Sequence, residues 1–527
     1  MRRIGCWILC VVMLAAVSCH EEPPASVLRS VTVAESVVKF SPQEQIRIHF
    51  EVDEPGFVFD LLDDVALYMA TGAKPLPDEV SLVEVLHDTE AGHYIAVITD
   101  TGMSEDYSIS VLLGVRKRGS RSFLFSVPFE CRSRYMVPHG VRVHTGLPTL
   151  YVDTEGNKPI VSKTDYLHAS LVVLEPDAEG PSDALSCSVR GRGNTTWTWP
   201  KKPYLVKMDA KASLLGMPAH KRWVLLANFM DRTLMRNLVA MKVSSMTSLD
   251  WTPRCRSVEL VLNGRHMGTY VLIEQVRVDK NRVPVGDEGW LLESDFHFDN
   301  EVQWLDPHGR CVQMKNGIPF GIKNPDPDDI TNEQVAEIKA FISETAEAIY
   351  GSAFADPEVG YARYIDVDSF IDYWIVFEVM GNHELGNPGS VFYHRAPGGK
   401  LKAGPCWDFD WGVLSYTANS TARTGLLNRY ACWYSRLFDD PVFHARVKAR
   451  FEELLPQLQT IPDYIDTLEQ QLAASAALNF KMWNPAQDAS QNGGHIINGD
   501  ENLSFTEAVA RLKTIYQERL AVIRENL

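Results

Sequence analysis

The chain has 527 residues, of which 45% are hydrophobic, and carries a formal net charge of −17. This length predicts two to four domains at about 150 residues each, and the apolar content is sufficient for packed cores. Because non-specific binding of nucleic acid requires a basic surface, a chain this acidic is expected to have no nucleic-acid partner.

The N-terminus has the pattern of a secretory signal. "MRR" supplies positive charge, "IGCWILCVVMLAAV" follows as an apolar run, and "AVSC" ends it at Cys19. A small residue before Cys resembles a bacterial lipoprotein cleavage site. We therefore expect a signal peptide at 1–18, lipidation of Cys19, and a tether at 19–26 that anchors the protein in the cell envelope. A plain cleaved signal or an uncleaved anchor are the alternatives. No later segment is long and apolar enough to span a bilayer.

The cysteines do not form a zinc motif. The chain has nine of them, and those after the signal region lack any C-x-x-C pair, which argues against a zinc site. In an exported protein some are expected to form disulfides, but their spacing does not say which. The cysteines after the signal region are Cys131, Cys187, Cys255, Cys311, Cys406 and Cys432.

Residues 27–135 alternate short β-rich segments with turns. "EQIRIHFEV", "HYIAVITD", "YSISVLLGV" and "RSFLFSVPF" show the period of two that is typical of half-buried strands. Their spacing predicts a small antiparallel β-sandwich of the Ig-like kind. We find no catalytic constellation in this segment, so we expect it to be a spacer or an adhesive module.

The residues that follow show both strand and helix patterns. Together with the β-rich segment before them, they predict a chain of the α+β class. "SVELVLNGRHMGTYVLI" predicts a hairpin that turns at Asn263. "DRTLMRNLVAMKVSSM" predicts a helix with Asp231 as N-cap. "TNEQVAEIKAFISETAEAIY" predicts another, which opens with a capping box of Thr331 and Gln334. "VDSFIDYWIVFEVM" predicts a buried helix, and the last hundred residues hold further helical patterns.

The segment "VRGRGNTTWTWPKKPYLVKMD" combines a glycine-rich turn with positive charge. Backbone donors beside cationic side chains suit a ligand that carries phosphates. A structural turn with solvated lysines is the alternative. In the strand "PYLVKMD", alternation places Lys207 on the same side as Leu205, so we expect it to lie partly inside beside an anionic partner. The candidates for ligand binding are Arg190, Gly193, Asn194, Lys202 and Lys207.

The loop "GNHELGNPGSVFYH" follows the buried helix. It is dense in glycine, asparagine and proline, as loops are, and loops on a rigid scaffold often carry function. Glu384 has the chemistry of a general base, and Asn387 offers an oxygen to a metal ion. A polar loop without any function is the alternative.

The stretch "WDFDWG" sets two carboxylates between three aromatic residues. Read as a strand, it places Asp408 and Asp410 on one side, about 6.6 Å apart, and Trp407, Phe409 and Trp411 on the core side. Mg²⁺ takes one or two carboxylates together with phosphate oxygens, so the pattern indicates a metal site. A pair of surface carboxylates, or carboxylates paired with arginines, are the alternatives.

Together these segments resemble the CotH kinase family. "RGRGNTTW", "KKPYLVKMD", "WVLLANFMDRTLMRNLVAMKV", "VELVLNGRHMGTYVLIEQVRVDKNRV" and "GPCWDFDWG" occur in one order, and the resemblance spans about 142–527. The chain looks most similar to the exported lipoproteins of this family in Bacteroidetes bacteria. The resemblance implies an atypical protein-kinase-like fold that transfers phosphate from ATP to Ser or Thr of a protein substrate.

The resemblance also implies residue roles on the nucleotide side. Lys207 would contact the phosphates of ATP, with Lys202 as a second candidate. Glu274, in "VLIEQV", would orient that lysine.

On the metal side, Asp408 and Asp410 would hold Mg²⁺ or Mn²⁺, and Asp408 is also a catalytic candidate. The loop is expected to supply an Asp as catalytic base and then an Asn as a further metal ligand. In this chain "NHE" places Glu384 at the position of that Asp, and Asn387 is the nearby Asn.

Two other functions remain open. The altered "NHE" loop, in a compartment poor in ATP, is compatible with a catalytically degenerate surface scaffold or adhesin. A glycosidase that uses Glu384 with Asp408 or Asp410 satisfies the two-carboxylate requirement, but it leaves the basic turn without a role.

Overall fold

The computed structural model describes residues 37–40, 45–51, 65–70, 74–75, 80–87, 93–100, 108–116, 121, 123–125, 128–133, 137, 140–297, 300–311, 316–483 and 498–527. The expected signal peptide, Cys19 and the tether lie outside these residues and stay predictions. The chain divides into two compact units, Met1–Met136 and Val137–Leu527, and each is described by itself.

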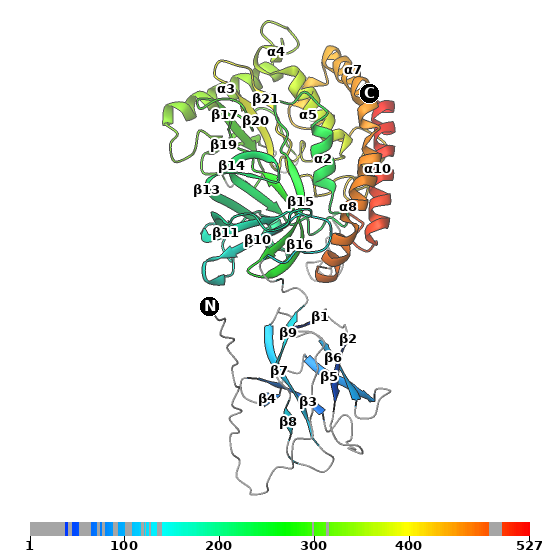
Figure 1. The fold of residues 1–527 in the computed structure, drawn as a ribbon. Coiled ribbons are helices and arrows are strands. Elements are labelled where there is room, and N and C mark those ends of the chain that lie inside the picture. Colours follow the sequence, from blue (N-terminus) through cyan, green and yellow to red (C-terminus); the bar gives the residue numbers. More distant parts are fainter. Residues whose placement is uncertain are drawn as a thin grey trace. The chain divides into compact units, whose positions relative to one another are not determined.

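The described residues of the first unit form two β-sheets (Figure 1). One has the strand order β1 (Val37–Phe40), β9 (Phe129–Ser133), β7 (Ser108–Val115), β3 (Val65–Met69) and β4 (Lys74–Pro75), with β8 (Leu124–Phe125) beside β7. The other has the order β2 (Gln45–Glu51), β6 (His93–Asp100) and β5 (Val80–His87). The β1–β9 pair is parallel, so the expectation of a wholly antiparallel arrangement is wrong, and the Ig-like assignment stays a prediction.

The second unit begins with a closed barrel. Its strands follow the order β10 (Thr149–Thr154), β11 (Leu167–Leu174), β12 (Leu185–Gly191), β13 (Tyr204–Leu214), β14 (Met217–Leu226), β16 (Arg265–Glu274) and β15 (Cys255–Leu262), and the parallel β10–β15 pair closes it. Alternate side chains fill the barrel; on β13 these are Tyr204, Val206 and Met208. Leu205, on the opposite side, packs outside the barrel in a second, larger core, to which the helices also contribute and which we call the main core. One strand therefore serves two cores.

The β15–β16 hairpin confirms the predicted turn. Asn263 and Gly264 connect the strands with φ values of 52° and 79°, as a type I′ turn requires. Further along β16, Gly268 also has a positive φ of 83°. A Cβ there would lie 2.5 Å from Oδ1 of Asn479, so this glycine lets a later helix approach the barrel closely.

Beside the barrel lies a five-stranded sheet with the order β18 (Gln303–Asp306), β19 (Ile318–Asn324), β17 (Trp290–Ser294), β20 (Val391–Arg395) and β21 (Lys402–Ala403). Helices pack on this sheet and on one side of the barrel (Figure 1). They are α1 (Thr195–Thr198), α2 (Arg236–Ser244), α3 (Asn332–Tyr350), α4 (Tyr361–Tyr364), α5 (Val367–Val379), α6 (Tyr434–Leu437), α7 (Pro441–Leu458), α8 (Ile461–Met482) and α10 (Phe505–Asn526), with 3-10 turns η1 (Glu155–Asn157) and η2 (Ser420–Arg423).

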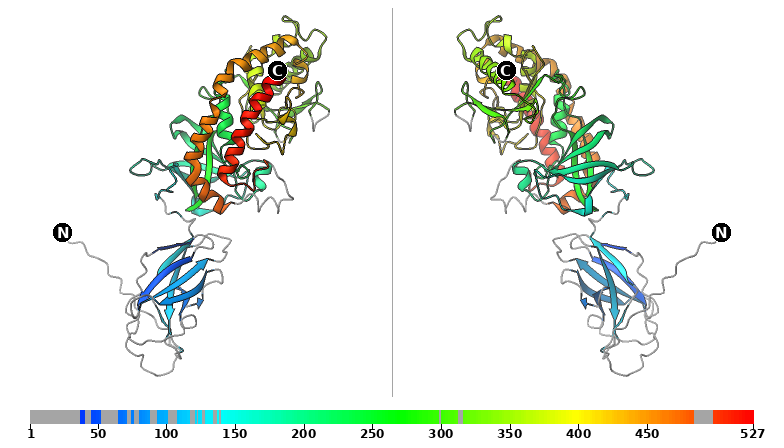
Figure 2. Two further views of the ribbon diagram at one scale, coloured as in Figure 1. Left: turned by 90° about the vertical axis from the view of Figure 1, so that its right-hand side faces the viewer. Right: turned by 90° about the vertical axis from the view of Figure 1, so that its left-hand side faces the viewer.

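Several predicted helices are confirmed. Helix α3 begins with the expected reciprocal capping box of Thr331 and Gln334. Helix α5 is buried along nearly its whole length, and α10 runs alongside α8 (Figure 2). No helix in the described part of the chain is long and apolar enough to cross a bilayer.

The start of α2 differs from the prediction. Asp231 is not its N-cap, because the helix begins five residues later at Arg236. Asp231 nevertheless accepts a hydrogen bond from the Arg236 amide at 2.9 Å, and its carboxylate pairs with the Arg236 guanidinium. The left-handed φ of 57° at Leu234 interrupts the helical pattern, which explains the late start.

Candidate functional site

The "WDFDWG" stretch is a clamped loop, so its prediction as a strand is wrong. Residues 404–410 have no regular secondary structure, and Asp408 has a φ of 64°. Instead of pairing with a strand, Phe409 N–H donates to Oδ1 of Asn237 at 2.8 Å and Gly412 N–H donates to Oδ1 of Asn498 at 3.0 Å. Side chains from distant segments therefore fix this backbone.

The prediction that the aromatic residues of this stretch face the core and its two carboxylates do not is confirmed in part. Trp407 and Phe409 are buried in the main core, while Asp408 and Asp410 are partly buried. Trp411 does not join the core with them. It is partly buried and stacks on Trp199, with the ring centroids 5.8 Å apart.

The structure brings three of the predicted carboxylates into one electrostatic group. Burial raises the pKa of Asp408 above its usual value. Burial, and then the Asp408 carboxylate, raise the pKa of Asp410 well above its usual value. Burial and Asp408 do the same to the pKa of Glu384, with a smaller contribution from Asp410. Like negative charges that raise a neighbour's pKa in this way favour a proton or a cation between them.

The Glu384 loop follows α5 directly, as predicted. Asn382 N–H donates to the carbonyl of Phe377 at 2.9 Å, which continues the helix end into the loop. Oδ1 of Asn382 then accepts from the Glu384 amide at 2.8 Å, and its Nδ2 lies 3.4 Å from Oε2 of Glu384. Asn387, later in the loop, has a buried Oδ1 with no hydrogen-bond partner in the described part of the chain.

Asp295 and His297 also belong to this group, although the sequence analysis did not select them. Asp295 follows β17, and its Oδ2 accepts from the amide of Ser390 in the Glu384 loop at 3.1 Å. Its Oδ1 lies 2.7 Å from Nδ1 of His297. The Asp295 charge contributes to the raised pKa of both Glu384 and Asp408. The acid–imidazole spacing in "SDFHF", directly after a buried strand, was the signal available in the sequence.

Arg192 is a cation whose charge acts on both Asp408 and Asp410. Burial lowers the pKa of its guanidinium, while the charges of Asp408, Asp410 and Glu293 act in the opposite direction. The guanidinium carbon lies 5.5 Å from the centroid of the Trp407 ring. The glycine-rich turn therefore does deliver positive charge to the acidic group, through Arg192.

A second cationic group lies around the ring of Tyr166. The guanidinium of Arg190 lies 5.0 Å and the ammonium of Lys207 lies 5.9 Å from the ring centroid, and Arg222 donates to the hydroxyl at 2.7 Å. Burial, with the charge of Arg222, lowers the pKa of Arg277 beside them. Positive charges gathered this closely favour an anionic ligand. We call Tyr166, Arg190, Lys207, Arg222 and Arg277 the Tyr166 cluster.

A comparison with protein-family models matches residues 189–523, well over half of the chain, to the CotH kinase protein family. The chain belongs to the CotH kinase family. No curated protein sequence matches it. The match begins within β12 and includes Arg192, the Glu384 loop and the Asp408–Asp410 loop.

The two predicted lysines of this CotH kinase family member lie in different environments. Lys207 is exposed, which corrects the expectation that it lies partly inside. In the sheet it pairs with Arg222, so their side chains share a face, and the neighbouring positive charge favours a solvated ammonium. Lys202 donates to the carbonyl of Trp197 at 2.7 Å and lies 5.4 Å from the centroid of its ring.

Glu274 does not have the expected contact with either lysine. Its buried carboxylate accepts hydrogen bonds from the Arg254 amide at 2.9 Å and from the Arg254 guanidinium at 3.0 Å. Arg282 lies 3.9 Å away. Two arginines neutralise this carboxylate, so the prediction that it orients a lysine is wrong.

The conformation of the glycine-rich turn is fixed by close packing at Gly193 and by hydrogen bonds from Lys163. Gly193 has a φ of 86°, and a Cβ there would lie 2.0 Å from the hydroxyl of Thr196. Lys163 donates to the carbonyl of Gly193 at 3.0 Å and lies 3.4 Å from Oδ1 of Asn194. These acceptor oxygens face a lysine, and the conformation of the turn determines where Arg192 lies.

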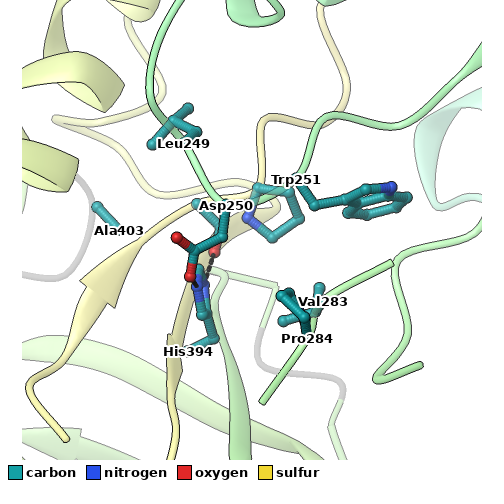
Figure 3. Close-up of a pocket in the computed structure, with 9 residues that line it drawn as sticks. Leu249, Asp250, Trp251, Val283, Pro284, His394 and Ala403 are labelled. Carbon is teal, nitrogen blue, oxygen red and sulfur yellow. Dashed lines mark hydrogen bonds and ion pairs between the residues drawn. The ribbon is translucent and has the colours of Figure 1, made fainter. Parts of the chain in front are cut away.

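A shallow pocket is lined by none of the carboxylates or cations described above (Figure 3). Asp250, Trp251 and His394 are among the residues that line it. The Asp250 carboxylate is already satisfied, since His394 lies 3.2 Å and Lys402 2.7 Å from it. The ionisable side chains Asp250 and His394 that line the pocket are therefore paired, while the buried Nε1 of Trp251 has no hydrogen-bond partner in the described part of the chain.

The donor set fits a hard divalent cation that also binds phosphate. No group of three His, Cys, Asp or Glu side chains arranged to hold a metal ion occurs among the residues that the structure describes. However, Mg²⁺ commonly uses only one or two carboxylates and takes its other ligands from phosphate and water. Asp408 and Asp410 supply the carboxylates, and Asn387 in the Glu384 loop has an Oδ1 without a hydrogen-bond partner in the described part of the chain, as a further oxygen ligand would require.

Proposed function

We propose that this protein is an ATP-dependent protein kinase that phosphorylates Ser or Thr of a surface or exported protein. The observation that carries the proposal is the charge of Arg192 acting on Asp408 and Asp410 inside the region that matches the CotH kinase family. Phosphoryl transfer depends mainly on positioning and on neutralising the charge of the phosphates. A partly buried cation whose charge acts on two carboxylates supports both requirements.

Asp408, Asp410 and Asn387 are the proposed ligands of Mg²⁺ or Mn²⁺. When bound, the cation would neutralise charge on the transferred phosphate. Arg192 is the proposed contact to phosphate oxygens near the carboxylates, which is supported by the desolvation of its guanidinium and by the charges of Asp408 and Asp410 that act on it. Charge-assisted hydrogen bonds of this kind are shorter and stronger than neutral ones.

The Tyr166 cluster is the proposed site for the remaining negative charge of ATP. Arg190 connects the two cationic groups, since its charge acts on both Arg192 and Arg277. We assign Lys202 and Lys207, expected from the sequence to contact the phosphates of ATP, the weaker role of raising the positive potential near the nucleotide. Gly193 and Asn194 contribute through the conformation of the turn that carries Arg192.

Glu384 is the proposed acceptor of the proton from the substrate hydroxyl. Asn382 fixes its backbone and approaches its carboxylate. Burial and the charge of Asp408 raise its pKa, so it is prone to hold a proton while the neighbouring carboxylates lack a cation. A cation at Asp408 and Asp410 would reduce this repulsion and leave Glu384 ionised as a base.

We also propose a lipid-anchored location in the cell envelope, which rests on the signal pattern and Cys19 in the sequence. A surface protein or an exported protein is then the expected substrate. The glutamate at the position of an expected Asp favours a second candidate, a degenerate scaffold or adhesin that keeps the fold without catalysis.

The test is to incubate the purified protein with γ-labelled ATP, Mg²⁺ or Mn²⁺, and Ser/Thr-containing protein acceptors. Kinase activity predicts metal-dependent label on Ser or Thr, lost in Asp410→Ala. Equal labelling by the wild type and Asp410→Ala would contradict the proposal. ATP binding with no transfer to any acceptor would favour the scaffold.

A further inference from the structure

Two buried cysteines that are distant in the sequence meet in the second unit. Cys311 lies shortly before β19, and Cys432 lies shortly before α6; each is 6% exposed. The thiol of Cys432 is within hydrogen-bonding reach of the thiol of Cys311. The structure has both as thiols.

Independent contacts fix the two segments against each other. The hydroxyl of Tyr350 donates to the carbonyl of Cys432 at 3.4 Å, and a Cβ on Gly309 would lie 2.6 Å from the same hydroxyl. Trp433 packs on Phe320 of β19 with the ring centroids 5.6 Å apart. The closeness of the cysteines therefore follows from packing on both sides of the pair.

We propose that Cys311 and Cys432 form an intramolecular disulfide when the chain folds in an oxidising compartment. The two thiols lose two protons and two electrons, and a sulfur–sulfur bond forms. The electrons pass to a disulfide oxidant by thiol–disulfide exchange, which reduces that oxidant to two thiols. This inference is independent of phosphoryl transfer.

The bond is expected to form before the segments are fully packed. Contact with the Cys311 thiol and burial raise the pKa of Cys432 well above its usual value. Because the thiolate is the reactive species, exchange in the folded protein is slow. The same burial then protects the finished bond from reductants.

The disulfide would restrain a segment that supports the Glu384 loop. Nδ2 of Asn428 donates to the carbonyl of Asn382 at 2.8 Å, and Asn428 itself accepts from the amide of Ala431, next to Cys432. A cross-link at Cys432 therefore limits the movement of Asn428, and through it of Asn382.

The first test uses the full chain folded in a glutathione redox buffer, alkylated without reductant under denaturing conditions, digested and examined by mass spectrometry. We expect one linked pair of peptides, containing Cys311 and Cys432 and lighter by two hydrogens than the separate peptides. Cys187 and Cys406 should be alkylated. Full alkylation of Cys311 and Cys432, or linkage of either to another cysteine, would overturn the proposal.

The second test compares melting temperatures of protein folded with and without the redox buffer. The buffer should raise the melting temperature of the wild type and of Cys187→Ser, a matched change at another buried cysteine, because a cross-link over a long loop restricts the unfolded chain. It should leave Cys311→Ser and Cys432→Ser unchanged. An equal rise in all four proteins would show that this bond is not responsible.

Discussion

Asn382 fixes Glu384 through two contacts: its Oδ1 accepts from the Glu384 amide at 2.8 Å, and its Nδ2 lies 3.4 Å from Oε2 of Glu384. Asn382 is itself fully buried and is anchored to the end of α5. The carboxylate is therefore oriented before any ligand arrives. This fixed placement offsets the flexibility that a glutamate has over an aspartate.

Replacing Glu384 by Gln tests its role as proton acceptor. Gln keeps the shape but cannot accept the proton, so we expect kcat for phosphoryl transfer to fall by about 10² to 10⁴-fold. ATP affinity, measured by equilibrium dialysis, should change little. Gln457→Glu, an exposed reverse change on α7, is the surface control. Unchanged kcat in Glu384→Gln would exclude Glu384 as the base.

Arg192 and Lys207 are predicted to differ sharply in their effect on ATP binding. Removing a desolvated charge that hydrogen-bonds to phosphate costs about 1.5–3 kcal/mol, so Arg192→Ala should raise the Kd for ATP by at least about tenfold. Lys207→Ala removes an exposed ammonium, and should raise it by less than about threefold because solvent screens this charge. Titration calorimetry on both variants checks the order. A larger effect at Lys207 would restore it as the main phosphate ligand.

The raised pKa values of Asp408 and Asp410 predict how the stabilisation of the fold by Mg²⁺ depends on pH. A carboxyl group whose pKa is raised by folding favours the folded state at low pH, and this contribution is lost as pH rises and the group ionises. A divalent cation would compensate for that loss, so the rise in melting temperature caused by Mg²⁺ should be larger near pH 8 than near pH 6. Asp410→Asn should remove most of this difference. A rise independent of pH would mean that Mg²⁺ binds elsewhere.

Lys201 predicts a separate pH effect on stability. Its fully buried amine donates to the Thr269 carbonyl and to Oδ1 of Asn479, and burial lowers its pKa to about 7. An unfolded lysine titrates near 10.4, so between about pH 7 and 10 the unfolded chain binds more protons and stability rises by about 1.4 kcal/mol per pH unit.

Lys201→Met should remove this slope, whereas Lys207→Met, at an exposed position, should keep it. Urea unfolding at several pH values gives the difference between each variant and the wild type. Parallel curves for the wild type and Lys201→Met would show that Lys201 stays charged in the folded state.

Local patterns predicted the elements whose signals lie close together in the sequence. The capping box of Thr331 and Gln334 and the turn at Asn263 involve residues within one or two turns of each other. The alternation in "WDFDWG" correctly separated Phe409 from the two carboxylates. Its backbone was predicted wrongly, because the hydrogen bonds that fix it come from Asn237 and Asn498, far away in the chain.

The electrostatic partners were the least predictable part of the site. Glu274 was expected beside a lysine, but Arg254 is close to it in the folded hairpin. Arg192 and Arg190 are equivalent in the sequence, yet packing directs one to the carboxylates and the other to Tyr166. Which cation meets which anion depends on the tertiary fold, and no local pattern contains that information.

The most direct test of the proposed site is the binding of ATP to the full chain with and without Mg²⁺, measured by equilibrium dialysis. We predict Mg²⁺-dependent binding that Asp410→Asn weakens by at least about tenfold, or about 1.4 kcal/mol. Asp463→Asn, the same change at an exposed position on α8, should bind as the wild type does. Binding that is absent, or that depends on neither Mg²⁺ nor Asp410, would contradict the assignment of these carboxylates to a metal–nucleotide site.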